Sequence, residues 1–133
     1  MKLLKILIIL LVVYVGVVVL FESLLGYFQP ANAQTMVITT TGADGVSNDR
    51  VLAKIESGGS LYAAANHWPR AWYEEALQNP NVQISINEVT GNYRAIPVTE
   101  PEHSTVNADR PLGLGFRALT GFPPRYFLRL EPQ

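Results

Sequence analysis

The hydrophobic pattern divides the chain into two unlike parts, and the first part is a long apolar run. Residues 6–21 contain no charged side chain and consist almost entirely of aliphatic and aromatic residues. Counted from Leu3, with Lys5 extending toward the surface, this segment would form a helix about 28 Å long. The hydrocarbon core of a bilayer is about 30 Å thick. Residues 3–21 therefore predict a helix that contacts the lipid bilayer.

Two interpretations of the first 33 residues are open. Lys2 and Lys5 precede the apolar run, and Ala31-Asn32-Ala33 resembles a signal-peptidase site, which together suggest a cleaved signal peptide. The run is longer than the apolar part of most signal peptides, and Ala33 lies twelve residues beyond its end. We therefore interpret residues 1–33 as a membrane anchor with a juxtamembrane linker. No further basic residue occurs before Arg50, so the positive-inside rule predicts a single pass of the inner (cell) membrane, with the N-terminus cytoplasmic and the domain outside.

Residues 34–133 show the alternation and turn signals of a small β domain. Pro69 begins a predicted helix over residues 69–78, and Asn79-Pro80 ends it. Residues 101–109 are a weak helix or a loop, and Ser57-Gly58-Gly59-Ser60 is a hairpin turn. The expected fold class is mainly β (α+β): a small six-stranded antiparallel split barrel with one or two short helices. The predicted strands are residues 35–41, 50–56, 61–65, 82–86, 93–98 and 125–130.

Composition and charge narrow the possible functions. The 133 residues include no cysteine and only two histidines, and the formal net charge is −1. A disulfide framework, a cysteine-based zinc site and a catalytic thiol are excluded. A metal site is not expected, and a nucleic-acid partner is not expected because the chain has no excess of positive charge.

Several segments carry a family resemblance. The chain contains Val37-Ile38-Thr39-Thr40-Thr41-Gly42, then Pro69-Arg70-Ala71-Trp72-Tyr73, then Leu77-Gln78-Asn79-Pro80-Asn81-Val82, and it ends near Arg125–Pro132. This order resembles the deazaflavin-dependent nitroreductase family, of which the chain would be a divergent, membrane-anchored member. These are split-barrel proteins, related in fold to the flavin-binding pyridoxamine-phosphate-oxidase group. The resemblance implies a deazaflavin or FMN cofactor between barrel and helix, and hydride transfer to a quinone or nitro acceptor.

The loop after Gly42 departs from the family pattern. Its counterpart in the family is basic and grips the cofactor phosphate, whereas here Asp44 stands where a lysine is expected and Asp49 lies near the arginine position. Carboxylates beside a phosphate weaken its binding. Heme, a flavin in another pose, a quinone alone or no cofactor therefore remain alternatives. Three residues of the loop are still candidates for cofactor binding through a guanidinium or backbone N–H groups: Ser47, Asn48 and Arg50.

A second candidate segment lies at the predicted junction between strand and helix. It holds a histidine, two tryptophans and an arginine, and such junctions direct backbone N–H groups toward anions. The functional interpretation is an aromatic wall for a planar ring, with a cation facing a phosphate. The structural interpretation is that Trp72 and Tyr73 seal the helix onto the barrel, and for Trp72 it is favoured. The candidate cofactor-binding residues are Asn66, His67, Trp68, Arg70 and Trp72.

A third segment, residues 111–125, is apolar but interrupted by glycine and proline. It would form a lid over a cleft, or contact the bilayer beside the anchor with Arg117 and Arg125 at the headgroups, or close one end of the barrel. The last of these is slightly favoured.

Two functions follow from these features. The first is a membrane-tethered oxidoreductase that passes hydride from a reduced cofactor to a lipophilic quinone or nitro compound. The alternative is a non-catalytic split-barrel module, accessory or ligand-binding, that has lost the phosphate grip. A homodimer or a membrane-protein partner is possible with either, and no residue is assigned a catalytic role.

Overall fold

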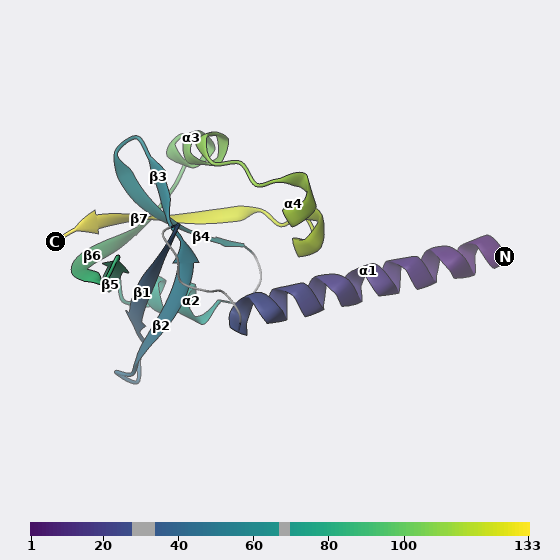
Figure 1. Ribbon diagram of the computed structural model, residues 1–133, viewed down its shortest axis with the longest axis horizontal. Coiled ribbons are helices and arrows are strands. Elements are labelled where there is room, and N and C mark those ends of the chain that lie inside the picture. Colours follow the sequence, from purple (N-terminus) through teal and green to yellow (C-terminus); the bar gives the residue numbers. More distant parts are fainter. Residues whose placement is uncertain (28–33, 67–69) are drawn as a thin grey trace. The chain divides into compact units, whose positions relative to one another are not determined.

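The computed structural model describes residues 1–27, 34–66 and 70–133 (Figure 1). The chain forms two compact units, Met1–Gln29 with Leu112–Pro123, and Pro30–Pro111 with Pro124–Gln133. The predicted boundary between an anchor (1–33) and a domain (34–133) stays a prediction, since residues 28–33 lie outside the described residues. The elements are α1 (Lys2–Tyr27), β1 (Thr35–Thr41), β2 (Ser47–Ala53), β3 (Ile55–Ser57), β4 (Ser60–Asn66), α2 (Ala71–Gln78), β5 (Asn81–Ile86), β6 (Val89–Pro97), α3 (Glu102–Asp109), α4 (Leu114–Thr120) and β7 (Arg125–Pro132).

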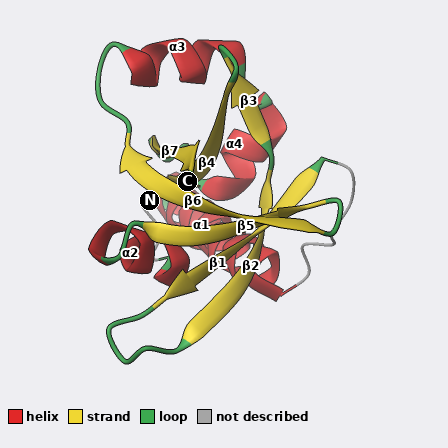
Figure 2. Cartoon of the chain, turned by 90° about the vertical axis from the view of Figure 1, so that its left-hand side faces the viewer, coloured by secondary structure: helices red, strands yellow, loops and turns green. Residues whose placement is uncertain are grey.

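The second unit is built on one antiparallel sheet with the order β2-β1-β5-β6-β7-β4-β3. Its two edge strands, β2 and β3, are consecutive in the chain and separated only by Lys54. Since one residue joins the two edges, the sheet has to roll up, and its twisted strands cross one another in Figure 2. The predicted α+β split-barrel class is confirmed. The sheet has seven strands rather than the expected six because the predicted strand over residues 50–56 is interrupted at Lys54.

Two tight turns determine the register of the hairpins. Gly58 and Gly59 have φ values of 57° and 81° between β3 and β4, a backbone conformation that glycine adopts without steric cost. Asn87 and Glu88, with φ values of 50° and 66°, make the corresponding turn between β5 and β6. The predicted pairing of these two strands is present, but its turn is shorter than the expected 87–92, so β6 begins at Val89.

Alternating side chains of the rolled sheet supply two apolar clusters. Along β4, Ala63 and Ala65 face the inner cluster, whereas Tyr62 faces an outer one. Helix α2 covers the inner face and α3 the outer face. The buried inner residues are Met36, Ile38, Leu52, Ala63, Ala65, Trp72, Ala76, Val82, Ile84, Ala95, Leu128 and Leu130, and the outer ones are Ile55, Tyr62, Val106 and Phe127.

Polar contacts fasten α3 to the outer face. The carboxylate of Glu102 accepts hydrogen bonds from the Tyr62 hydroxyl, at 2.7 Å, and from Arg129. These bonds stabilise the charged form, so they lower the pKa of Glu102. At the other end of the helix, Ser57 donates a hydrogen bond to Asp109.

The first unit combines α1 with α4. Helix α1 is long and apolar enough to cross a membrane over Lys2–Leu24, and an 18-residue window within it has a mean hydropathy of 3.1. A signal sequence would have the same length and composition. Within the predicted apolar segment 111–125, Leu114–Thr120 form α4, which contacts α1 within the same compact unit. The segment was expected to close one end of the barrel, but Leu112–Pro123 belong to the unit of α1 and not to that of the sheet. Arg125 belongs instead to β7, where its guanidinium donates to Asn107 and to the carbonyl of Arg110.

Candidate functional site

Helix α2 closes one end of the inner face. Arg70 precedes it in an extended conformation, with φ −131° and ψ 108°, and the helix begins at Ala71. Trp72 and Ala76 are both buried, because residues four apart lie on the same helical face. The structure thus places Trp72 in the inner apolar cluster, in agreement with its structural interpretation.

The alternation of β2 separates the residues of the acidic loop. Leu52 is buried in the inner cluster, so Arg50 and Asn48, at every second position, belong to the same inner face. Asp49 lies on the opposite face, where it accepts a hydrogen bond of 2.6 Å from Thr39. The carboxylate expected to repel a phosphate therefore lies on the other side of the strand from Arg50.

Asp44 has a local role in the turn between β1 and β2. Its Oδ1 accepts a hydrogen bond of 3.0 Å from the backbone N–H of Val46. The turn is further closed by Gly45, whose φ is 78° and whose N–H donates to the carbonyl of Gly42. Asp44 thus stabilises the turn itself.

The predicted site residues are only partly brought together. Ser47 shares the outer face of β2 with Asp49 and is hydrogen-bonded to Thr41 at 3.0 Å. Asn66, by the alternation of β4, belongs to the face of Tyr62. His67 and Trp68 lie outside the described residues.

The positive charge of Arg70 acts on Arg50. Burial lowers the pKa of the half-buried Arg50, and the positive charge of Arg70 lowers it further. Two cations that repel each other at a partly desolvated position raise the local positive potential. An anion bound near both would relieve the repulsion.

A carboxylate network joins α2 to β1 and β2, and of its members only Asn48 was identified as a candidate in the sequence. Glu75 of α2 accepts hydrogen bonds from the Thr40 hydroxyl, at 2.7 Å, and from the Asn48 amide, at 3.4 Å. Two weak signals were available: Thr40 continues the inward alternation of Met36 and Ile38, and Glu75 follows Trp72 by three positions. The Asn48 amide, which shares the inner face of β2 with Arg50, is thus engaged by Glu75.

Aromatic rings border the same end of the barrel. The rings of Tyr73 and Tyr126 lie 6.3 Å apart, and Tyr73 also meets Trp72 edge to face at 5.8 Å. Burial raises the pKa of Tyr73, and the neighbouring Glu74 raises it further. Tyr126 follows the alternation of Leu128 and Leu130 and remains 42% exposed. We call Arg50, Arg70, Tyr73, Glu75 and Tyr126 the barrel mouth.

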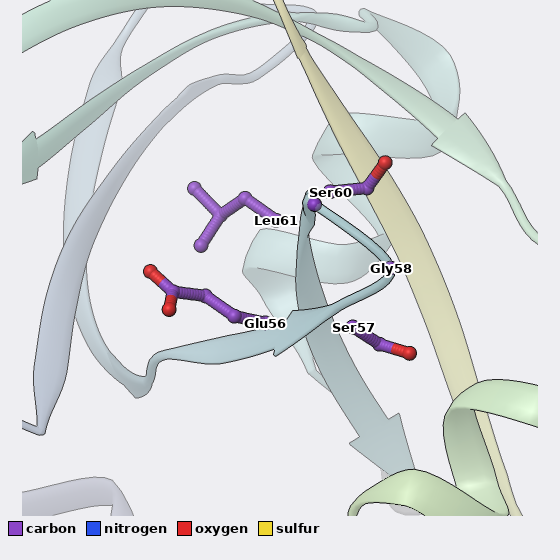
Figure 3. Close-up of a pocket in the computed structure, with 6 residues that line it drawn as sticks. Glu56, Ser57, Gly58, Ser60 and Leu61 are labelled. Carbon is purple, nitrogen blue, oxygen red and sulfur yellow. The ribbon is translucent and has the colours of Figure 1, made fainter.

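Two hollows among the described residues are lined by none of the barrel-mouth residues. One, of about 400 Å³, surrounds the β3–β4 hairpin, where Glu56 and Leu61 point to one side and Ser57 and Ser60 to the other (Figure 3). The Ser57 hydroxyl is already used to hold α3. The other, of about 460 Å³, is a polar groove on the outer face lined by Thr39, Thr41, Ser47, Asn79, Asn81, Val82, Gln83, Asn92 and Gln133. Among the described residues, no group of three histidine, aspartate or glutamate side chains is placed to hold a metal ion.

Solved structures provide the comparison for this arrangement. An F420-H2-dependent reductase, FDR-A, is 18% identical, with a TM-score of 0.56 over 76% of this chain and 98% of its own. A putative pyridoxamine 5'-phosphate oxidase from Listeria innocua is 14% identical, with a TM-score of 0.53 over 91% and 94%. These structures share the split-barrel fold of this chain. The heme storage protein HutZ from Vibrio cholerae shares it, at 16% identity and a TM-score of 0.56 over 77% and 83%. No family model and no curated protein matches the chain.

Proposed function

We propose that this chain is a membrane-anchored split-barrel oxidoreductase that binds a phosphate-bearing deazaflavin or FMN at the barrel mouth. The observation that carries the proposal is the position of Arg50 on the inner face of β2, where it feels the positive charge of Arg70, the residue just before α2. Each guanidinium is a rigid fork of N–H donors that suits phosphate oxygens. The similarity of the fold to reductases that use such cofactors supports the same proposal.

The aromatic part of the barrel mouth suits the other end of such a cofactor. The Tyr73 and Tyr126 rings offer an apolar surface for a planar ring system beside the arginines. When bound, a reduced deazaflavin or flavin supplies a hydride, which with a proton converts a quinone to the quinol. The role of the chain's own residues is to bind the phosphate, orient the ring and exclude water.

The membrane anchor is supported by the contacts of α1. A signal peptide is removed from the mature protein and needs no partner in the fold. Here the Tyr14 hydroxyl donates a hydrogen bond of 2.8 Å to the carbonyl of Ala118, and the Phe21 and Phe116 rings meet edge to face at 5.8 Å. Cleavage after Ala33 would remove these contacts, so we propose that α1 is retained and holds the domain near a lipophilic quinone or nitro acceptor. The orientation, with the domain outside, and a homodimer stay predictions.

A non-catalytic module is the second candidate. Glu75 places a carboxylate beside Asn48 on the inner face, and Asp44 stands where the family pattern has a cation, so the phosphate grip is weaker than in the family pattern. Since one protein of this fold stores heme, heme is a useful competing ligand.

The test is a cofactor titration of the full chain in lipid nanodiscs. Both tryptophans belong to residues 34–133, so their fluorescence reports on the barrel and not on α1. Deazaflavin F420, FMN, riboflavin and heme are added in turn. Riboflavin carries the ring of FMN without its phosphate, and it therefore separates the contribution of the arginines from that of the tyrosines.

Saturable quenching by F420 or FMN, with weaker binding of riboflavin, would support the proposal. Oxidation of the reduced cofactor by a quinone in the same nanodiscs would then establish the reaction. Binding of heme alone, or of no ligand to a folded barrel, would refute it in favour of the non-catalytic module.

A further inference from the structure

Helix α4 contacts α1 along one helical face. Tyr14, Val18 and Phe21, which are four and three positions apart, meet Ala118, Gly121 and Phe116, respectively. A Cβ atom on Gly121 would lie 3.4 Å from Cγ1 of Val18, so the absence of a side chain at Gly121 permits this close approach. Val18 is only 4% exposed as a result.

The position of these contacts along α1 indicates how deep they would lie in a bilayer. The apolar span runs from Lys2 to Leu24, and Tyr14 lies ten residues before its end. At a rise of about 1.5 Å per residue this is about 15 Å, half the thickness of the hydrocarbon core. If α1 crosses the bilayer, the carbonyl of Ala118 is held well below the membrane surface.

We propose that α4 is a second membrane-embedded segment, which enters the bilayer beside α1 with lipid acyl chains as the partner of its exposed face. This inference rests on the membrane anchoring proposed above. The exposed side of α4 and of the turn after it is apolar: Leu114 is 72% exposed, Leu119 39% and Phe122 52%. The helix carries one charged residue, Arg117, whose long side chain lies over the Phe122 ring and can extend toward the headgroups.

The carbonyl groups at the C-terminal end of α4 have hydrogen-bond partners within the protein, as an environment without water requires. A helix terminus in hydrocarbon needs partners for its last carbonyl groups, since each unpaired group costs several kcal/mol. Here the carbonyl of Ala118 accepts from Gly121 N–H and from the Tyr14 hydroxyl. The carbonyl of Arg117 accepts from Phe122 N–H, and the Thr120 hydroxyl donates to both Phe116 and Arg117. The positive φ of Gly121, 82°, allows the chain to turn back and make these bonds.

The absence of native cysteine makes single-cysteine labelling direct. Four variants of the full chain are labelled with an environment-sensitive fluorophore and reconstituted in phosphatidylcholine–phosphatidylglycerol vesicles. Leu114→Cys and Leu119→Cys report on α4, and Val12→Cys reports on α1. Val89→Cys is the matched control, because it is an aliphatic residue, 74% exposed, at the β5–β6 turn of the other unit.

We expect both α4 probes to show blue-shifted emission, quenching by spin-labelled lipid and loss of quenching by iodide, as for Val12→Cys. The Val89→Cys probe should be quenched by iodide alone. If the α4 probes behave like Val89→Cys while Val12→Cys is in lipid, the anchor stands and the embedding of α4 is refuted. If Val12→Cys is also quenched by iodide alone, membrane anchoring fails, and this inference fails with it.

Discussion

Replacing Arg50 by glutamine tests the barrel mouth most directly. Glutamine keeps a hydrogen-bonding side chain on the inner face of β2 but removes the positive charge. In the ligand-free protein Arg50 is partly desolvated and repelled by Arg70. Loss of its charge therefore relieves an unfavourable interaction there, whereas in the complex it removes a charge-assisted hydrogen bond to the phosphate. The two effects have opposite signs.

The expected magnitude follows from the half-buried position of Arg50. A hydrogen bond to a charged group contributes about 1.5–3 kcal/mol, and partial exposure favours the lower end of this range. Since about 1.4 kcal/mol corresponds to a tenfold change, Arg50→Gln should raise the Kd for FMN about tenfold. The stability of the free barrel should change by less than about 0.5 kcal/mol, which is about 2–4 °C in Tm.

The assay compares FMN and riboflavin titrations, and thermal unfolding, for Arg50→Gln and for Arg94→Gln. Arg94 is an exposed arginine of β6 that stands opposite Glu131 in the register of the sheet and is not one of the barrel-mouth residues. Riboflavin affinity should be unchanged in both variants. An equal loss of FMN and riboflavin affinity, or a large drop in Tm with unchanged FMN affinity, would refute the assignment of Arg50 to the phosphate.

Three further predictions concern the stability of the barrel. Trp72→Ala should lower the free energy of unfolding by about 3–5 kcal/mol, as a cavity in the inner cluster does, and circular dichroism during urea unfolding would measure the loss; a change below 1 kcal/mol would place Trp72 outside the core. Glu102→Gln should cost about 0.5–1 kcal/mol at neutral pH. Because the folded pKa of Glu102 lies below its unfolded value, this difference is fully present above the unfolded pKa and vanishes as the pH falls through the folded pKa, so urea unfolding at several pH values checks the sign. Glu88→Gly should stabilise the β5–β6 turn by about 0.5–1 kcal/mol because it removes a left-handed conformation of a non-glycine residue, and an unchanged or lower Tm would contradict this.

Local signals in the sequence were sufficient for the elements whose partners are near in the chain. The β5–β6 hairpin was predicted from alternation on both sides of a turn, and α2 from Pro69 and from Asn79-Pro80 at its ends. The apolar run of α1 was evident from length and composition alone. Each of these features depends on interactions within about 15 residues, which a periodic pattern records directly.

The candidate site depended on contacts that no local pattern records. Asp44 and Asp49 look in sequence like repulsive charges beside Arg50, yet one closes its own turn and the other lies on the opposite face of β2. Glu75 reaches Thr40 across 35 positions, and the prediction of this contact requires the relative placement of α2 and β1.

Where a segment packs against a partner far away in the chain, only the tertiary structure determined its conformation. Residues 111–125 contain glycines and prolines that suggest a loop. Residues 114–120 are nevertheless helical, and this helix contacts α1, which lies about a hundred residues earlier in the chain. The division of the predicted strand 50–56 into β2 and β3 also depends on the tertiary structure. The interruption at Lys54 lets the chain pass from one edge of the rolled sheet to the other. Amino-acid periodicity determines which residues share a face of an element. Which faces meet is determined by burial of the whole chain, because only the assembled fold removes both surfaces from water.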